Sequence, residues 1–112
     1  MKMPNADQAV VPAAKVFYLL SEQKSGGKDK FFKKFGFFVA QWERLQAALL
    51  RHGQTHEVTQ IIVTDFGVKY LIDGHLVTPD ERNPFVRSVW QLDHQANNPR
   101  FVTAYPVKEL SQ

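Results

Sequence analysis

The chain lacks cysteine among its 112 residues, which excludes a disulfide framework and any metal site built on thiolates. It also lacks a run of about 18 apolar residues, so no membrane-spanning helix is predicted. Residues 1–11 hold one lysine and no long apolar segment, and therefore do not resemble a secretory signal. These absences predict a cytoplasmic protein, unless a specialised system exports it.

Motifs that mark common enzyme classes are absent as well. There is no Gly-x-Ser-x-Gly, P-loop or dinucleotide motif, and the glycine pair before Lys28 is too short to be one. The histidines follow no zinc-binding spacing; they are His52, His56, His75 and His94. The sequence therefore predicts neither a cofactor nor a metal.

Composition predicts one folded domain. Hydrophobic residues make up 44% of the chain and aromatic residues 12%, enough to bury a core. We expect a flexible arm over residues 1–11, a single domain over 12–107 and a tail over 108–112. The net charge of +3 permits an anionic partner but is equally typical of an ordinary soluble domain.

The first half of the chain has helical patterns. Residues 13–20 predict a short helix, although their continuous apolar run also fits a buried strand. Residues 28–35 and 39–52 predict two further helices, and Gly53 is positioned to end the second of them.

The second half alternates with the period of a strand. Strands are predicted over 56–64 and 68–72, followed by a turn at Asp73–Gly74. Residues 75–77 fit either a further short strand or a bulged continuation of the strand before them. Residues 85–106 read as a hairpin around an Asn/Pro loop. The order predicts an α+β fold, in which two or three N-terminal helices pack on one face of a roughly four-stranded antiparallel sheet.

The uncovered face of such a sheet can carry polar groups. Strict alternation places Arg87 opposite the face that holds Trp90, which we expect in the core with Trp42. In the next strand it places Phe101, Thr103 and Tyr105 on one face. The two strands are expected to be neighbours.

Several separated motifs occur in an order that resembles a bacterial family, domain of unknown function 6883. They are Lys30-Phe31-Phe32, Phe35-Gly36-Phe37, Gly67-Val68-Lys69-Tyr70, Gly74 with Leu76, Thr78-Pro79-Asp80, Val86-Arg87-Ser88-Val89-Trp90, Pro99-Arg100 and Val102-Thr103-Ala104-Tyr105-Pro106. The resemblance spans residues 16–106 and implies no activity, because the family has none assigned.

The predicted order of elements is also similar to the barnase/EndoU/colicin/RelE-like group of metal-independent ribonucleases and toxins. Members often carry an arginine on one late strand and Thr or Ser with Tyr on the next. By this resemblance the catalytic residues are Lys69, Arg87, Thr103 and Tyr105. The group frequently has a histidine or glutamate base, and no residue of this chain matches its position.

Metal-free RNA cleavage needs a base for the 2′-hydroxyl, cations for the phosphate and an acid for the leaving oxygen. Arg87 suits the phosphate, and His94 and His75 are candidate bases because histidine titrates near neutrality. The alternative is that Arg87 pairs with Asp93 or Glu81 and both histidines lie in solvated loops.

A lysine-rich segment supplies a second candidate surface for nucleic acid. Five lysines against one aspartate occupy residues 24–34, among them Lys28, Lys30, Lys33 and Lys34. The alternative interpretation is a solvated helix face whose phenylalanines enter the core.

Three function classes follow from these patterns. The first is an RNA-cleaving or RNA-interacting toxin-type domain, with RNA as partner. The alternative is a non-catalytic protein-interaction module of a phage or toxin system, whose partner is a cognate antitoxin or immunity-like protein. Nucleic-acid binding without cleavage is a third, and it predicts binding that weakens with salt.

Overall fold

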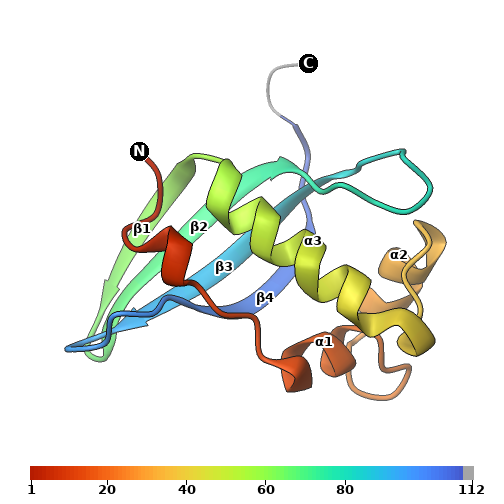
Figure 1. Cartoon of the computed structure of the whole chain (residues 1–112), viewed down its shortest axis with the longest axis horizontal. Coiled ribbons are helices and arrows are strands. Elements are labelled where there is room, and N and C mark those ends of the chain that lie inside the picture. Colours follow the sequence, from red (N-terminus) through yellow and green to blue (C-terminus); the bar gives the residue numbers. More distant parts are fainter. Residues whose placement is uncertain (110–112) are drawn as a thin grey trace.

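The computed structural model describes residues 1–109, and its helices precede its strands along the chain (Figure 1). This arrangement confirms the predicted α+β fold. The elements are η1 Ala6–Gln8, α1 Ala13–Leu19, α2 Lys28–Lys34, η2 Val39–Gln41, α3 Trp42–Thr55, β1 Val58–Thr64, β2 Gly67–His75, β3 Phe85–Asp93 and β4 Arg100–Pro106.

The strands form one antiparallel sheet in the order β1-β2-β3-β4. Figure 1 shows α3 lying across the sheet, where it packs on β2 and β3, while α1 packs on β4. All three helices bury side chains in the same hydrophobic core, which contains Trp90 at its centre and has Trp42 at its border. One face of the sheet therefore faces the helices, and we call the opposite face the outer face.

A β-bulge in β4 changes which residues share a face. Val89 pairs with Thr103 while the next residue, Trp90, pairs with Phe101, so Val102 is an extra residue in β4. Phe101 and Ala104 are consequently both buried in the core. The expectation that Phe101 shares a face with Thr103 is therefore wrong, because strict alternation fails at the bulge.

Two predicted breaks do not occur, and close packing explains both glycines. Gly53 lies inside α3, where a Cβ atom would come 2.3 Å from Cζ2 of Trp90. Gly74 lies inside β2, where a Cβ atom would come 2.5 Å from the His56 ring. The predicted turn at Asp73–Gly74 is absent, and β2 continues to His75.

Residues 1–11, expected to form a loose arm, contribute three side chains to the core: Met3, Ala9 and Val11. Three backbone hydrogen bonds hold the segment, one of them from the Phe101 N–H to the Val10 carbonyl at 2.9 Å. The Val58 N–H donates to the Met1 carbonyl at 2.8 Å, and the Val10 N–H donates to the Pro99 carbonyl at 2.9 Å. The segment has no periodic apolar pattern, so its packing depends on partners that a local pattern does not reveal.

A buried polar chain joins α3 to the sheet. Trp90 Nε1–H donates to Ser88 Oγ at 2.8 Å, and Ser88 lies 2.8 Å from His52 Nδ1. His52 Nε2 lies 3.1 Å from the Gly74 carbonyl and 3.2 Å from the Val86 carbonyl. Carbonyls only accept, so Nε2 carries the proton and Nδ1 accepts from the Ser88 hydroxyl. The neutral imidazole satisfies every group in this chain.

Burial lowers the pKa of His52 from its ordinary value near 6.5 to about 4. As the pH falls from 6.5 to 4, the His52 imidazole therefore binds a proton in the unfolded chain but stays neutral in the folded chain. We expect the unfolding free energy to fall through this window by on the order of 3 kcal/mol from this one group. NMR titration of the imidazole measures the pKa directly, and a midpoint between pH 6 and 7 would contradict the account.

Candidate functional site

Arg87 lies at the centre of a cross-strand row on the outer face. It pairs in register with Asp73 of β2 on one side and with Tyr105 of β4 on the other. Its Nε and Nη2 donate to the Asp73 carboxylate at 2.7 and 2.9 Å. The bidentate pair fixes the plane of the guanidinium group and leaves Nη1 outside the contact with Asp73.

The site remains accessible although the pair is well formed. The Arg87 side chain is 28% exposed and that of Asp73 is 15% exposed. Hydrogen bonding to Asp73 raises the pKa of Arg87, and the Tyr105 hydroxyl acts in the same direction. Of the proposed acidic neighbours, neither Asp93 nor Glu81 forms this pair. Asp93 lies instead 3.3 Å from the Arg100 guanidinium.

A lysine from outside the sheet lies beside Thr103 and Tyr105. Lys28, the first residue of α2, donates from Nζ to Thr103 Oγ1 at 3.1 Å. The same Nζ lies 6.0 Å from the ring centroids of both Tyr18 and Tyr105. A hydroxyl, a phenol and an ammonium group therefore gather next to Arg87 at the β4 edge of the sheet, beyond the point where Val10 bridges to Arg100.

Lys69 shares the outer face but lies away from this group. It precedes Asp73 by four positions in β2, which corresponds to about 13 Å along a strand. Its cross-strand partner is Gln91, which in turn pairs with Arg100. Gln91 is only 5% exposed, and its Nε2 has no hydrogen-bond partner within residues 1–109.

The two candidate bases lie at opposite ends of the sheet. His75 ends β2 on the outer face, two positions beyond Asp73, and its Nδ1–H donates to the Asn83 carbonyl at 2.8 Å. Its Nε2 lies 3.5 Å from a Glu109 carboxylate oxygen, a contact that is an ion pair when the imidazole is protonated. His94 follows β3, and its backbone N–H donates to the Phe66 carbonyl in the turn between β1 and β2. Only His75 lies near Arg87.

The other lysines of α2 do not join Lys28. Lys33 lies 3.6 Å from Asp29 and 3.7 Å from Glu22, and the Lys34 ammonium lies 5.6 Å from the Phe35 ring centroid. Lys30 is exposed. The structure thus separates the four lysines of α2 into one residue at the outer face and three elsewhere.

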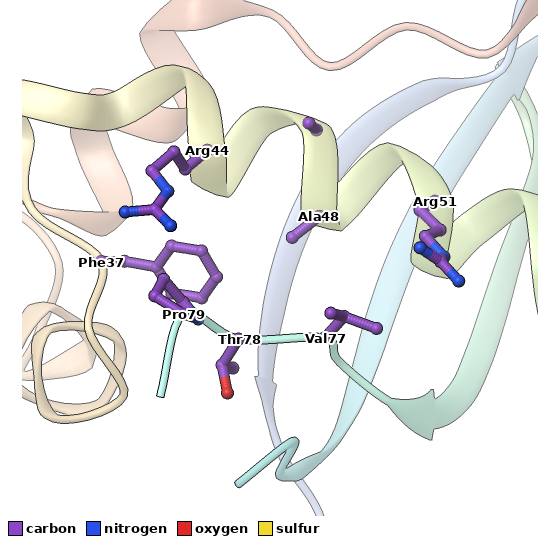
Figure 2. Close-up of a pocket in the computed structure, with 8 residues that line it drawn as sticks. Phe37, Arg44, Ala48, Arg51, Val77, Thr78 and Pro79 are labelled. Atoms are coloured by element: carbon purple, nitrogen blue, oxygen red, sulfur yellow. The ribbon is translucent and has the colours of Figure 1, made fainter. Parts of the chain in front are cut away.

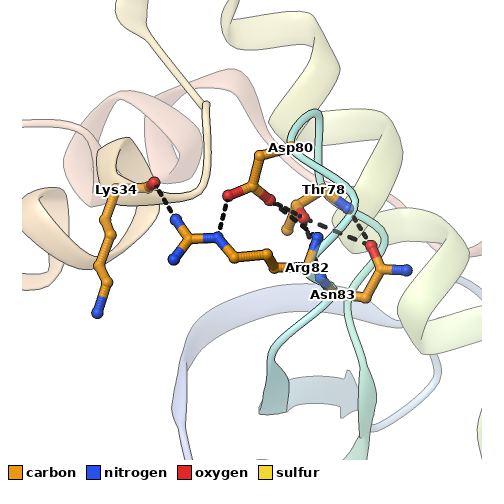
Figure 3. Close-up of polar contacts among 5 residues, drawn as sticks. All are labelled: Lys34, Thr78, Asp80, Arg82 and Asn83. Carbon is orange, nitrogen blue, oxygen red and sulfur yellow. Dashed lines mark hydrogen bonds and ion pairs between the residues drawn. The ribbon is translucent and has the colours of Figure 1, made fainter.

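The loop between β2 and β3 is held by its own polar contacts. Asn83 Oδ1 accepts from the Thr78 N–H at 2.9 Å, and Asp80 accepts from the Thr78 hydroxyl at 2.8 Å (Figure 3). Arg82 pairs with Asp80 and donates to the Lys34 carbonyl at 2.8 Å, which ties the loop to the end of α2. The loop therefore holds Asn83, the anchor of His75, in place.

A hollow of about 330 Å³ lies between this loop and α3. Arg44 and Arg51 project from α3 above an apolar floor that includes Val77 (Figure 2). Arg44 donates to Gln41 at 3.1 Å. None of the residues that line this hollow belongs to the outer face.

Sequence reasoning missed two residues of the site. The Asp-Gly pair predicts a turn at Asp73, and Tyr18 lies in a segment that predicts a helix or a buried strand without a role for its side chain. The period-two pattern from Lys69 through Leu71 was a signal for Asp73, since it places the carboxylate on the same face. No local signal brings Tyr18 to β4.

Two further features bear on the class of site. Over residues 1–109, no group of three or more His, Asp or Glu side chains is arranged to hold a metal ion. Within the same range, every helix is too short or too polar to cross a membrane.

Comparisons with known proteins place the chain among relatives. The model of a family described as "Domain of unknown function (DUF6883)" matches residues 2–108. No curated protein sequence matches the chain. A solved structure from Klebsiella pneumoniae 342, a contact-dependent growth inhibition toxin–immunity protein complex, contains a chain with the same fold. The TM-score is 0.70 at 14% identity, with 94% of this chain and 98% of that chain covered.

Proposed function

This chain belongs to the family of domain of unknown function 6883, and from that premise we propose that it is a toxin-type domain that cleaves RNA without a metal. The observation that carries the proposal is the row formed by Asp73, Arg87 and Tyr105 on the outer face, with Lys28 and Thr103 beside it. The fold shared with a chain of a toxin–immunity complex supports the link to toxin systems.

The proposed reaction is attack of a ribose 2′-oxygen on the adjacent phosphorus. The 2′-O–P bond forms, the P–O5′ bond breaks, and the products are a 2′,3′-cyclic phosphate and a 5′-hydroxyl. His75 Nε2 takes the proton from the 2′-hydroxyl, and the Tyr105 hydroxyl gives a proton to the leaving 5′-oxygen. The Nη1 edge of Arg87, which does not contact Asp73, and the Lys28 ammonium stabilise the charge that develops on the phosphate oxygens.

The other residues of the face take supporting roles in this proposal. Asp73 orients the Arg87 guanidinium through the bidentate pair. Thr103 positions Lys28 through its hydroxyl. Lys69 lies too far along β2 to reach the same phosphate, so it is assigned to a neighbouring phosphate of the RNA strand.

Incubation of the purified chain with total RNA in excess EDTA tests this function. We expect cleavage to proceed, because the proposed chemistry uses only side chains of the outer face. Intact RNA after prolonged incubation, at protein concentrations matched to the RNA, would remove the catalytic proposal.

A second function is favoured by a different surface, the free edge of β1. This edge strand contains no charged residue, and it exposes Ile61, Ile62 and Val63, with Phe66 in the turn that follows. Val63 and Phe66 are each 77% exposed. An unpaired, uncharged edge suits the addition of a strand from another protein. The alternative function is therefore binding of a cognate immunity-like protein without catalysis.

Val63→Lys tests the edge by placing a charge in the proposed contact. Co-expression with a candidate immunity protein, followed by size-exclusion chromatography, is expected to give a complex, and a binding titration is expected to show that this variant weakens it by tenfold or more. Val77→Lys is the matched control, because Val77 is also exposed but lies outside β1. Equal complex formation by both variants would exclude β1 as the docking edge.

A further inference from the structure

Two adjacent hollows border the β4 edge of the sheet. The first, of about 440 Å³, is lined by Ala14, Lys15, Tyr18, Lys28, Val102 and Thr103. The second, of about 510 Å³, is lined by Ala14, Phe17, Tyr18, Ser21 and Lys24. They share Ala14 and Tyr18, so the Tyr18 side chain forms part of both walls. Together they make a cleft that runs from α1 to the edge of the outer face.

The cleft combines three properties of single-stranded RNA sites. Lys15, Lys24 and Lys28 line it, and no acidic residue does. Tyr18 is 41% exposed, which leaves its ring available for a base to stack on. Lys28 lies between the rings of Tyr18 and Tyr105, 6.0 Å from each centroid, so the cleft adjoins the proposed catalytic row.

We propose that this cleft is a nucleotide subsite that binds the RNA segment next to the cleaved bond, with one base stacked on Tyr18 and adjacent phosphates held by Lys15 and Lys24. The inference rests on the proposed function in taking RNA as the ligand. Lys28 and Thr103 join the two sites, since their hydrogen bond spans the boundary between the cleft and the outer face. Stacking on an aromatic ring tolerates every base, so this subsite gives affinity and register with little sequence preference.

Binding of a fluorescein-labelled, mixed-sequence 2′-O-methyl oligoribonucleotide tests the subsite apart from cleavage, because the blocked 2′-oxygen cannot attack. Tyr18→Ala is expected to raise the Kd about tenfold or more, the effect of losing one base–aromatic stack. Lys15→Ala is expected to reduce the magnitude of the slope of log K against log salt by about 0.7. This is the effect of losing one lysine–phosphate contact to a single strand.

Two control variants remove an aromatic ring and a positive charge at positions outside the cleft. Phe38→Ala deletes an exposed aromatic ring outside the cleft, and Arg44→Ala deletes a charge from the hollow beside α3. Both are expected to bind the oligonucleotide as the unmodified chain does. Thermal melting checks that all variants fold, and Tyr18 is exposed enough for its loss to be tolerated.

The outcomes separate the subsite from the catalytic proposal. Weakened binding in Tyr18→Ala together with no RNA cleavage by the unmodified chain supports the subsite and removes the nuclease. RNA cleavage together with a Tyr18→Ala Kd within twofold of the unmodified chain overturns the subsite and leaves the nuclease. Absence of any oligonucleotide binding by the unmodified chain also overturns the subsite.

Discussion

Arg87→Ala is expected to lower the rate of RNA cleavage by about 100- to 1000-fold, the usual effect of removing one preorganised charge or donor from a transition state. The guanidinium is held in place by Asp73 before substrate arrives, so no reorganisation is needed when charge develops on the phosphate. Single-turnover cleavage of a short RNA, at saturating protein, measures the change in the chemical step.

Arg100→Ala is the matched control for this prediction. Arg100 begins β4, is paired with Asp93 and carries the same charge, but its cross-strand partner is Gln91 rather than Asp73. We expect this variant to keep at least half of the cleavage rate. Equal losses in both variants would mean that net charge, and not the Arg87 geometry, accounts for the effect.

The Arg87 variant also leaves Asp73 half-buried without its partner, so stability must be measured alongside activity. The double variant Asp73→Asn with Arg87→Ala removes this unpaired charge. If the double variant folds as stably as the unmodified chain and is still inactive, loss of folding is excluded as the cause. Recovery of activity in the double variant would contradict a catalytic role for Arg87.

Ser88→Ala is expected to lower the unfolding free energy by about 2 to 4 kcal/mol, the largest effect on stability of a single side chain that we predict here. The Ser88 hydroxyl is fully buried and joins the Trp90 indole N–H to His52 Nδ1. Its loss leaves one donor and one acceptor unsatisfied in the core, and each costs about 1 to 3 kcal/mol. Urea denaturation at pH 7 measures the change.

Ser21→Ala controls for loss of a hydroxyl. Ser21 also forms two hydrogen bonds, but it accepts them from backbone N–H groups in an exposed turn where water replaces it. We expect its unfolding free energy to change by less than about 0.5 kcal/mol. A Ser88→Ala variant as stable as Ser21→Ala would show that the buried chain contributes no net stability.

Local periodicity was sufficient to predict the order and type of the main elements. The apolar stripe of α3 and the alternation in β3 and β4 are properties of consecutive residues, so they can be read without knowing the partners. The roles of Gly53 and Gly74 could not be predicted in this way. Both glycines are required because Trp90 and His56 approach them from distant segments of the chain. A turn signal and a packing requirement look the same in the sequence.

In the candidate site, too, some features follow from local alternation and others depend on long-range packing. Alternation predicted that Thr103 and Tyr105 share a face, and the register of β3 with β4 brings Tyr105 opposite Arg87. The bidentate partner of Arg87 depends on β2 continuing past Asp73, which the Asp-Gly pair argued against. The approach of Lys28 and Tyr18 to β4 depends on how the helices pack, and no spacing along the chain encodes it.

The central claim is that the outer face cleaves RNA through the 2′-oxygen without a metal. The most direct measurement is mass spectrometry of the new ends produced by the purified chain from a defined RNA oligonucleotide in EDTA. The account predicts 2′,3′-cyclic phosphate and 5′-hydroxyl ends, which are missing when the RNA carries 2′-O-methyl groups. Ends with 5′-phosphate, or no cleavage by the unmodified chain, would contradict it.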